Sequence, residues 1–276
     1  MIRFLAALSI IPLLATQVMA CSAETACSVG DRDYYIELPS SDEPNGAVIY
    51  LHGWGGSGKG ALRNRRMVDG FLERGFAVIA PDGVRREGRN GRTWRFHPAT
   101  GEQQNEMAFL AEVKADAVTR FDLNPDDFIL GGFSIGGSMT AYAACLGPDN
   151  FAAFVPIGGN FWRPHPDRCE GPVKMLHTHG WTDTTVPLEG RVVNGVPITD
   201  PDAFAQGDIF QALQIWRETN GCVHLRADRF VTDGPFLRRA WDRCDADTAL
   251  ELAVFPGGHT IPNGWPDLVI NWYESL

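Results

Sequence analysis

Gly132-Phe133-Ser134-Ile135-Gly136 is the stretch that decides the fold of this 276-residue chain. The apolar run 128–130 precedes it, and the small-residue segment 137–144 follows it. We therefore expect a strand, a sharp turn and a helix in that order. Gly-x-Ser-x-Gly in this context is typical of a nucleophile elbow. Its serine has a strained backbone conformation, and the residues two positions away on either side must be very small.

This turn predicts a reactive hydroxyl and a group that stabilises negative charge. It lifts the Ser134 hydroxyl above the sheet and leaves the Ile135 N–H at the start of a helix, where it is free to stabilise an oxyanion. A second donor is expected in the glycine loop after the buried strand 47–51, and we assign it to the Trp54 N–H. His52, in the same loop, is expected to pack or to hydrogen-bond beneath it.

A serine hydroxyl needs a histidine to take its proton and a carboxylate to orient that histidine. Asp183 follows a predicted strand at 173–179, and His259 follows another at 249–255. Chemistry in α/β sheets lies at the carboxyl ends of strands, where both residues are expected. Ser134, Asp183 and His259 also occur in the chain order Ser, Asp, His of α/β-hydrolases.

Other residues compete for the roles of acid and base. Asp200, Asp202 and Asp208 are alternative acids, but their positions suit the start of a helix that runs from about 202 to 220. Among the other histidines, His224 is a weak rival because it precedes the last strand.

The substrate pocket is expected to be walled by aromatic side chains. Most of the candidates lie within a few residues of the carboxyl end of a predicted strand, the edge that also carries the reactive residues. Trp216 is assigned to the core because it lies on an apolar helix face. The expected wall residues are Trp54, Trp94, Phe161, Trp162 and Trp181.

Alternating strands and helices predict an α/β fold with a mostly parallel central sheet and helices on both faces. Residues 1–20 combine Arg3, an apolar core and the small-residue exit Val18-Met19-Ala20, so they are typical of a signal peptide. Residues 21–276 are expected to form one secreted or periplasmic domain. No later segment has the run of about 18 apolar residues that a membrane span needs. Cys21 is a possible lipid anchor, although Val18 stands where a lipoprotein signal prefers leucine.

Charge and glycine spacing bear on other functions. The chain has 24 basic and 34 acidic side chains, a formal net charge of −10, which argues against nucleic acid as a partner. Gly53, Gly58 and Lys59 fit the phosphate-loop spacing, but Gly60 replaces the serine or threonine that would hold magnesium. We therefore expect no nucleotide and no other cofactor.

Histidine and cysteine spacing bear on metals and disulfides. His177 and His179 suggest zinc, yet no further ligand occurs at useful spacing, so no metal is expected. Six cysteines in an exported chain suggest disulfides, and six allow 15 pairings. Proximity in the sequence favours local pairs, which are Cys21–Cys27, Cys145–Cys169 and Cys222–Cys244.

Taken together, these motifs resemble those of secreted polyhydroxybutyrate depolymerase-like and feruloyl esterase-like α/β-hydrolases. The likeness rests on five segments: Leu51-His52-Gly53, Gly132-x-Ser134-x-Gly136-Gly137, His179-Gly180-x-x-Asp183-x-x-Val186-Pro187, Trp216 with Asn220-Gly221-Cys222, and Gly257-Gly258-His259. The resemblance implies a serine esterase with the triad named above. It also implies short polyester oligomers or phenolic acid esters as substrates. A peptidase, a thioesterase or a non-catalytic binding protein on the same fold is the alternative.

Overall fold

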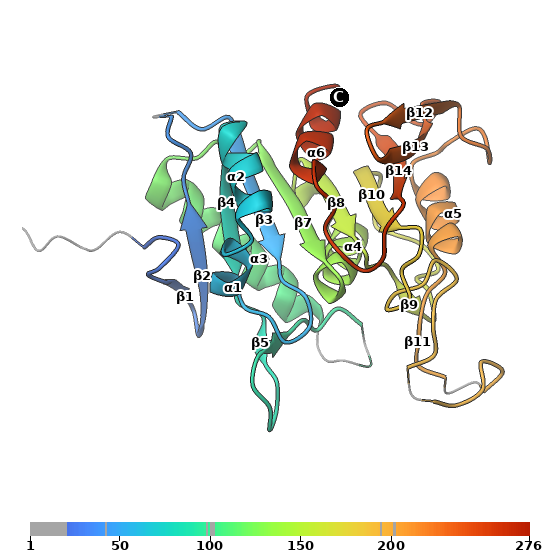
Figure 1. Ribbon diagram of the computed structural model, residues 1–276, viewed down its shortest axis with the longest axis horizontal. Helices are drawn as coiled ribbons and strands as arrows, with labels where there is room; N and C mark the ends of the chain where they lie inside the picture. Colours follow the sequence, from blue (N-terminus) through green and yellow to red (C-terminus); the bar gives the residue numbers. More distant parts are fainter. Residues whose placement is uncertain (1–20, 42, 98, 100–102, 194, 201–202) are drawn as a thin grey trace, which may run out of the picture.

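The computed structural model describes residues 21–276 except 42, 98, 100–102, 194 and 201–202. Its largest sheet has ten strands in the order β1-β2-β4-β3-β7-β8-β10-β14-β13-β12. The six strands from β4 to β14 in this order are parallel to one another. Antiparallel strands extend the sheet on both sides. The predicted α/β class with a mostly parallel central sheet is confirmed (Figure 1).

The parallel strands are short apolar runs that are buried on both sides, as expected for a sheet with helices on both faces. They are β4 (Phe76–Pro81), β3 (Gly46–Leu51), β7 (Phe128–Phe133), β8 (Ala153–Ile157), β10 (Lys174–Gly180) and β14 (Ala249–Phe255). The flanking strands are β1 (Cys27–Val29), β2 (Arg32–Glu37), β13 (Phe236–Trp241) and β12 (Arg229–Asp233).

Helices pack on both faces of the sheet and create two apolar cores. One core contains residues of α3 (Gln103–Phe121), α4 (Ile135–Leu146) and α5 (Ile209–Thr219). The other contains residues of α1 (Gly58–Leu62), α2 (Arg65–Glu73) and α6 (Trp265–Tyr273). None of the helices within the described residues is long and apolar enough to span a bilayer.

Two further pairs of strands belong to loops beyond the carboxyl ends of the parallel strands. β5 (Val84–Arg85) pairs with β6 (Arg92–Thr93), and β9 (Trp162–Arg163) pairs with β11 (Ala205–Gln206). In Figure 1 both pairs lie below the main sheet, with β9 and β11 beneath β10 and α5. These pairs were not predicted, because a strand of two residues leaves no periodic pattern in the sequence.

The predicted buried strands and the helix ending near residue 220 are confirmed, with one boundary corrected. That helix, α5, begins at Ile209 and not near residue 202, because Asp208 caps it by accepting the N–H groups of Phe210 and Gln211. It stops where Gly221 adopts the left-handed conformation, with φ of 61°. The predicted signal peptide, at 1–20, lies outside the described residues.

All three disulfides that sequence proximity predicted are present: Cys21–Cys27, Cys145–Cys169 and Cys222–Cys244. The sulfur of Cys21 is bonded to that of Cys27, so it is not available for a lipid thioether. The Cys222–Cys244 bridge closes a loop that contains β12 and β13, and it contributes about 3 kcal/mol of stability in the chain-entropy model.

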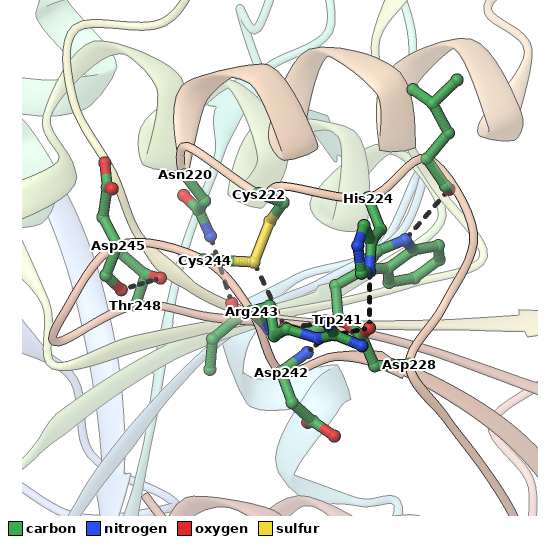
Figure 2. The surroundings of a disulfide bond; sticks show 12 residues. Asn220, Cys222, His224, Asp228, Trp241, Asp242, Arg243, Cys244, Asp245 and Thr248 are labelled. Carbon is green, nitrogen blue, oxygen red and sulfur yellow. Dashed lines mark hydrogen bonds and ion pairs between the residues drawn. A yellow bond between two sulfur atoms is a disulfide. The ribbon is translucent and has the colours of Figure 1, made fainter.

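The segment around the Cys222–Cys244 bridge is fixed to the sheet by polar contacts (Figure 2). The fully buried Asn220 amide accepts the Val173 N–H at 2.9 Å and donates to the Val173 carbonyl at 2.8 Å. Nearby, Asp228 binds both His224 and Arg243. The end of α5 is therefore held against the start of β10, the strand that leads to Asp183.

Candidate active site

Ser134 lies in a sharp turn between β7 and α4, with φ of 61° and ψ of −123°. Such a conformation is rare for a residue with a Cβ and is typical of functional positions. The flanking glycines leave the turn just enough room. A Cβ on Gly132 would lie 2.5 Å from the carbonyl of Gly136, and one on Gly136 would lie 2.2 Å from the Leu51 oxygen.

The structure brings Ser134, Asp183 and His259 together from three separate strand ends. His259 Nε2 lies 2.9 Å from Ser134 Oγ, and His259 Nδ1 lies 2.7 Å from Asp183 Oδ2. The Phe133 ring packs against the imidazole, with 4.6 Å between ring centroids. The histidine is thus hydrogen-bonded through both nitrogens, with one toward a hydroxyl and the other toward a carboxylate.

Asp183 is buried, with 6% of its surface exposed, and its carboxylate faces N–H groups of the backbone and of histidines. Oδ1 accepts the N–H groups of Thr185 and Val186, each at 2.8 Å. Oδ2 faces His259, and His179 Nε2 lies 3.6 Å from the same oxygen. These contacts leave the carboxylate one orientation, in which Oδ2 is reserved for His259.

Behind Asp183, two buried histidines of β10 support the turn that carries it. His179 Nε2 donates to the Val186 carbonyl at 2.8 Å, so its Nδ1 is free to accept from His177 Nε2 at 3.1 Å. Burial lowers the pKa of His177 well below its usual value, and the neighbouring His179 lowers it further. Burial also lowers the pKa of His179. The pair considered above for zinc is therefore a neutral hydrogen-bonded pair.

Replacing His177 with asparagine is expected to reduce the acid sensitivity of the fold. Below about pH 6.5, the unfolded chain protonates this histidine while the folded state resists protonation. Stability is therefore lost as the pH falls, by up to about 1.4 kcal/mol per pH unit for one group. Urea unfolding of both proteins from pH 8 to pH 5 measures the two slopes. Parallel slopes would show that His177 is not the group protected from protonation.

The glycine loop after β3 lies directly beside the nucleophile. A Cβ on Gly53 would be 3.5 Å from the Ser134 Cβ. His52 fixes the loop from beneath, as expected, because its Nε2 accepts the Gly83 N–H at 3.0 Å and its Nδ1 donates to the Gly53 carbonyl at 2.8 Å. Burial lowers the pKa of His52, which keeps it neutral for this bonding pattern. Trp54 is the next residue in the loop.

A mostly apolar cavity of about 530 Å³ opens beside Ser134. Three of the five aromatic residues predicted to wall it, Trp54, Trp94 and Trp162, line it. The other lining residues are Thr93, Phe96, Ser134, Ile135, Ser138, Thr185, Val186, Arg191, Val193, Phe204 and Gln206.

The prediction was wrong for Phe161 and Trp181. Phe161 is fully buried, because its ring stacks on Trp216 at 5.3 Å between centroids and packs against Tyr142. Trp181 is 64% exposed and is not part of the cavity wall. Both residues follow strands as expected, but position in the chain does not determine the direction in which a side chain points.

The rival acids and the rival base have other positions. Asp208 caps α5, as expected, and Asp202 lies outside the described residues. Asp200 lies in a turn in which its carbonyl accepts the Ala203 N–H. His224 binds Asp228 on the segment between α5 and β12.

Several residues of the cavity lining were not singled out from the sequence. They include Phe96, Phe204 and the polar pair Arg191 and Gln206. The only signal was the alternation of side chains in Arg191-x-Val193 and Phe204-x-Gln206. Such short alternation occurs by chance in many loops, so it predicts little without the pairing partner.

Several known proteins to which this chain is similar are named as esterases. Feruloyl esterase B of Piromyces equi is 25% identical over 202 residues, which are 70% of this chain and 36% of that protein. The bifunctional acetylxylan esterase/xylanase XynS20E of Neocallimastix patriciarum is 27% identical over 168 residues, which are 59% of this chain and 23% of that protein. The alignments thus span well under half the length of these two curated relatives.

Solved structures agree on the fold. The acetyl xylan esterase from Aspergillus awamori has a TM-score of 0.62 at 16% identity, with 89% of this chain and 95% of that chain covered. The carboxylesterase from Mesorhizobium loti has a TM-score of 0.57 at 17% identity, with 91% and 99% covered. At such identities the likeness concerns the fold alone. The model of the alpha/beta hydrolase fold family matches residues 46–206, more than half of the sequence, and the chain therefore belongs to the α/β-hydrolase family.

Proposed function

We propose that this protein is a secreted serine esterase that hydrolyses carboxylic esters through an acyl-enzyme. The observation that carries the proposal is the hydrogen-bonded line from Ser134 Oγ through His259 to Asp183, with distances of 2.9 and 2.7 Å. The positive φ of Ser134 supports it, because backbone strain of this kind is found at functional sites.

In the first half of the reaction, Ser134 Oγ attacks the ester carbonyl carbon while His259 Nε2 takes the hydroxyl proton. The carbonyl π bond opens, and the oxygen becomes an anion. When that bond reforms, the bond to the alcohol oxygen breaks, and His259 gives the proton to the departing alcohol. Asp183 holds the His259 Nδ1 proton throughout and stabilises the transient imidazolium.

The oxyanion is stabilised by the N–H groups of Ile135 and Trp54. Ile135 is the first residue of α4, and the first N–H groups of a helix have no acceptor within the helix. A Cβ on Gly53 would lie 3.5 Å from the Ser134 Cβ, and this closeness supports placing the Trp54 N–H beside the nucleophile. Water then repeats the sequence on the acyl-enzyme, with His259 as the base, and releases the acid.

The acyl group occupies the apolar cavity, and the alcohol leaves past His259. The cavity lining includes Ser134 and Ile135 but not His259, which must lie next to the leaving oxygen in order to protonate it. Short polyhydroxyalkanoate oligomers and feruloyl-type esters have acyl groups that suit apolar walls. The three disulfides and the export signal expected at 1–20 support an oxidising, extracytoplasmic location.

A screen of the purified protein tests this function. It comprises p-nitrophenyl esters, methyl ferulate, hydroxybutyrate oligomers, a thioester and a peptide amide, with fluorophosphonate labelling followed by intact mass. We expect turnover of oxygen esters and one added phosphonyl group. Faster turnover of the thioester or the amide would reassign the enzyme to those substrates. Failure to label or to turn over any substrate would favour a binding protein on this fold.

A further inference from the structure

A small three-stranded ladder forms one wall of the apolar cavity. β9 and β11 pair so that Gln206 is opposite Trp162. Residues 191–193 add a third strand through the bridge between Val192 and Ala205. Two backbone hydrogen bonds of 2.9 Å hold this strand, from Gln206 N–H to the Arg191 carbonyl and from the N–H of residue 193 to the carbonyl of residue 204. Arg191 therefore lies directly opposite Gln206.

Alternation along these strands sorts the side chains onto two faces. The lining of the cavity follows the alternation, because the members of one face all contact the cavity while Arg163, Val192 and Ala205 do not. The cavity-facing set is Trp162, Arg191, Val193, Phe204 and Gln206. Directly opposite residues of an antiparallel pair have Cβ atoms about 5 Å apart. The Arg191 and Gln206 side chains thus start side by side on the cavity face.

Neither side chain uses all of its hydrogen-bonding groups within the described residues. Arg191 is the one charged residue in the cavity lining, and it makes no ion pair with any residue that the structure describes. Gln206 is only 5% exposed, yet its Oε1 is buried without a hydrogen-bond partner. A buried amide oxygen without a partner costs about 1–3 kcal/mol. The Nε2 group of the same amide is not enclosed in this way and remains able to donate a hydrogen bond.

We propose that Arg191 and Gln206 form a subsite for a carboxylate at the far end of the acyl group. The preferred substrates are then half-esters of dicarboxylic acids and other esters whose acyl part ends in a free acid. This proposal rests on the proposed esterase function, and it adds the substrate class. A guanidinium matches a carboxylate with two parallel N–H groups, and the Gln206 amide can donate a third.

The surroundings strengthen the preference for an anion at this point. The wall around Arg191 is apolar, with Trp162, Val193 and Phe204 in it, so the guanidinium is the one charged group there that attracts an anion. The chain as a whole has a formal net charge of −10, which disfavours anions elsewhere on its surface. Arg191, which is solvent-exposed where it lines the acyl cavity, is the single cation of that lining and therefore discriminates between charged and neutral acyl groups.

Matched methyl esters test the subsite, because the leaving alcohol is the same in each. Monomethyl succinate, adipate and suberate are compared with methyl butyrate, hexanoate and octanoate. We expect the wild-type protein to prefer at least one half-ester over its neutral match. Arg191→Gln should lower kcat/KM for that half-ester by about 10-fold, the low end for a charged hydrogen bond, because Arg191 is solvent-exposed. It should change kcat/KM for the neutral esters by less than about twofold.

Arg163→Gln is the matched control, because Arg163 belongs to the same ladder but is not part of the cavity lining. It should leave both ester series unchanged. Equal losses for charged and neutral esters in Arg191→Gln would overturn the proposal and make Arg191 a support of the wall. A preference for methyl 4-hydroxycinnamate that depends on Arg191, without one for half-esters, would also overturn it.

The two proposals fail in different ways. Absence of turnover with every ester would overturn the esterase function. Calorimetric titration of wild type and Arg191→Gln with free adipate would then decide the subsite independently. Binding to the wild type alone would support a carboxylate site, and absence of binding to both proteins would overturn it.

Discussion

Replacing Ser134 with alanine is expected to lower kcat for ester hydrolysis by about 10⁶-fold, the scale seen when a triad serine is removed. The variant loses the oxygen that would bond to the acyl carbon. Alanine keeps the Cβ, so it adds no strain at the φ of 61°. The fold should therefore survive, and His259 would lose only its contact with the hydroxyl. Rates with the best ester of the screen and circular dichroism measure the two effects.

Ser28→Ala is a control for the Ser134 variant. Ser28 lies on β1, where its hydroxyl donates to Asp33. We expect this control to keep full activity and to accept one fluorophosphonate, whereas Ser134→Ala accepts none. Labelling of the Ser134 variant at another serine would move the nucleophile elsewhere and invalidate the proposed mechanism.

Asp183→Asn is expected to lower kcat by about 10⁴-fold, as for loss of the orienting carboxylate in serine proteases. The geometry provides the reason. The Thr185 and Val186 N–H groups both donate to Oδ1, so the remaining oxygen of asparagine stays with them. The amide nitrogen then faces His259 Nδ1 and donates to it. His259 must carry its proton on Nε2, where it cannot accept the proton of Ser134.

Asp208→Asn separates this effect from the general loss of a carboxylate. Asparagine is as good a helix cap as aspartate, so α5 should remain intact and the activity unchanged. The measurement is kcat for both variants on one ester. A fully active Asp183→Asn enzyme, or an inactive Asp208→Asn enzyme, would show that the acid has been misassigned.

The arrangement of Ser134, Asp183 and His259 could be predicted because each depends on local signals and one general rule. Apolar runs define buried strands, and parallel strands place their carboxyl ends at one edge of the sheet. Three reactive residue types that each follow such a run are therefore expected at that edge. The hydrogen bonds from His259 agree with the pairing that this rule predicts.

The wall of the cavity could not be predicted in the same way. Residues 191–193 and β11 come from the loop between β10 and α5, whereas β9 comes from the loop after β8, and their pairing depends on the folded framework. Only the register of this ladder shows that Arg191 and Gln206 share a face. Phe161 and Trp181 were predicted to wall the cavity and do not belong to it. Both occupy the expected edge, but burial against Trp216 and exposure to solvent are decided by neighbours remote in sequence.

The histidine pair of β10 shows what alternation alone establishes. Two residues apart in a strand, His177 and His179 must point to the same face. That proximity is equally compatible with a metal ligand pair and with a hydrogen-bonded support. The Val186 carbonyl decides for support, because it fixes the proton of His179 on Nε2. The carbonyl belongs to a turn whose path is not encoded in the spacing of the histidines.

The three disulfides join cysteines that are consecutive along the chain, the first to the second, the third to the fourth and the fifth to the sixth. Their separations are 6, 24 and 22 residues, and no described cysteine is left over. Oxidation of the thiols in the order in which they occur along the chain would therefore make the native set directly. Exchange of wrongly paired disulfides takes seconds to hours. Oxidative refolding of the reduced protein should thus reach the native set with little exchange between wrong pairs.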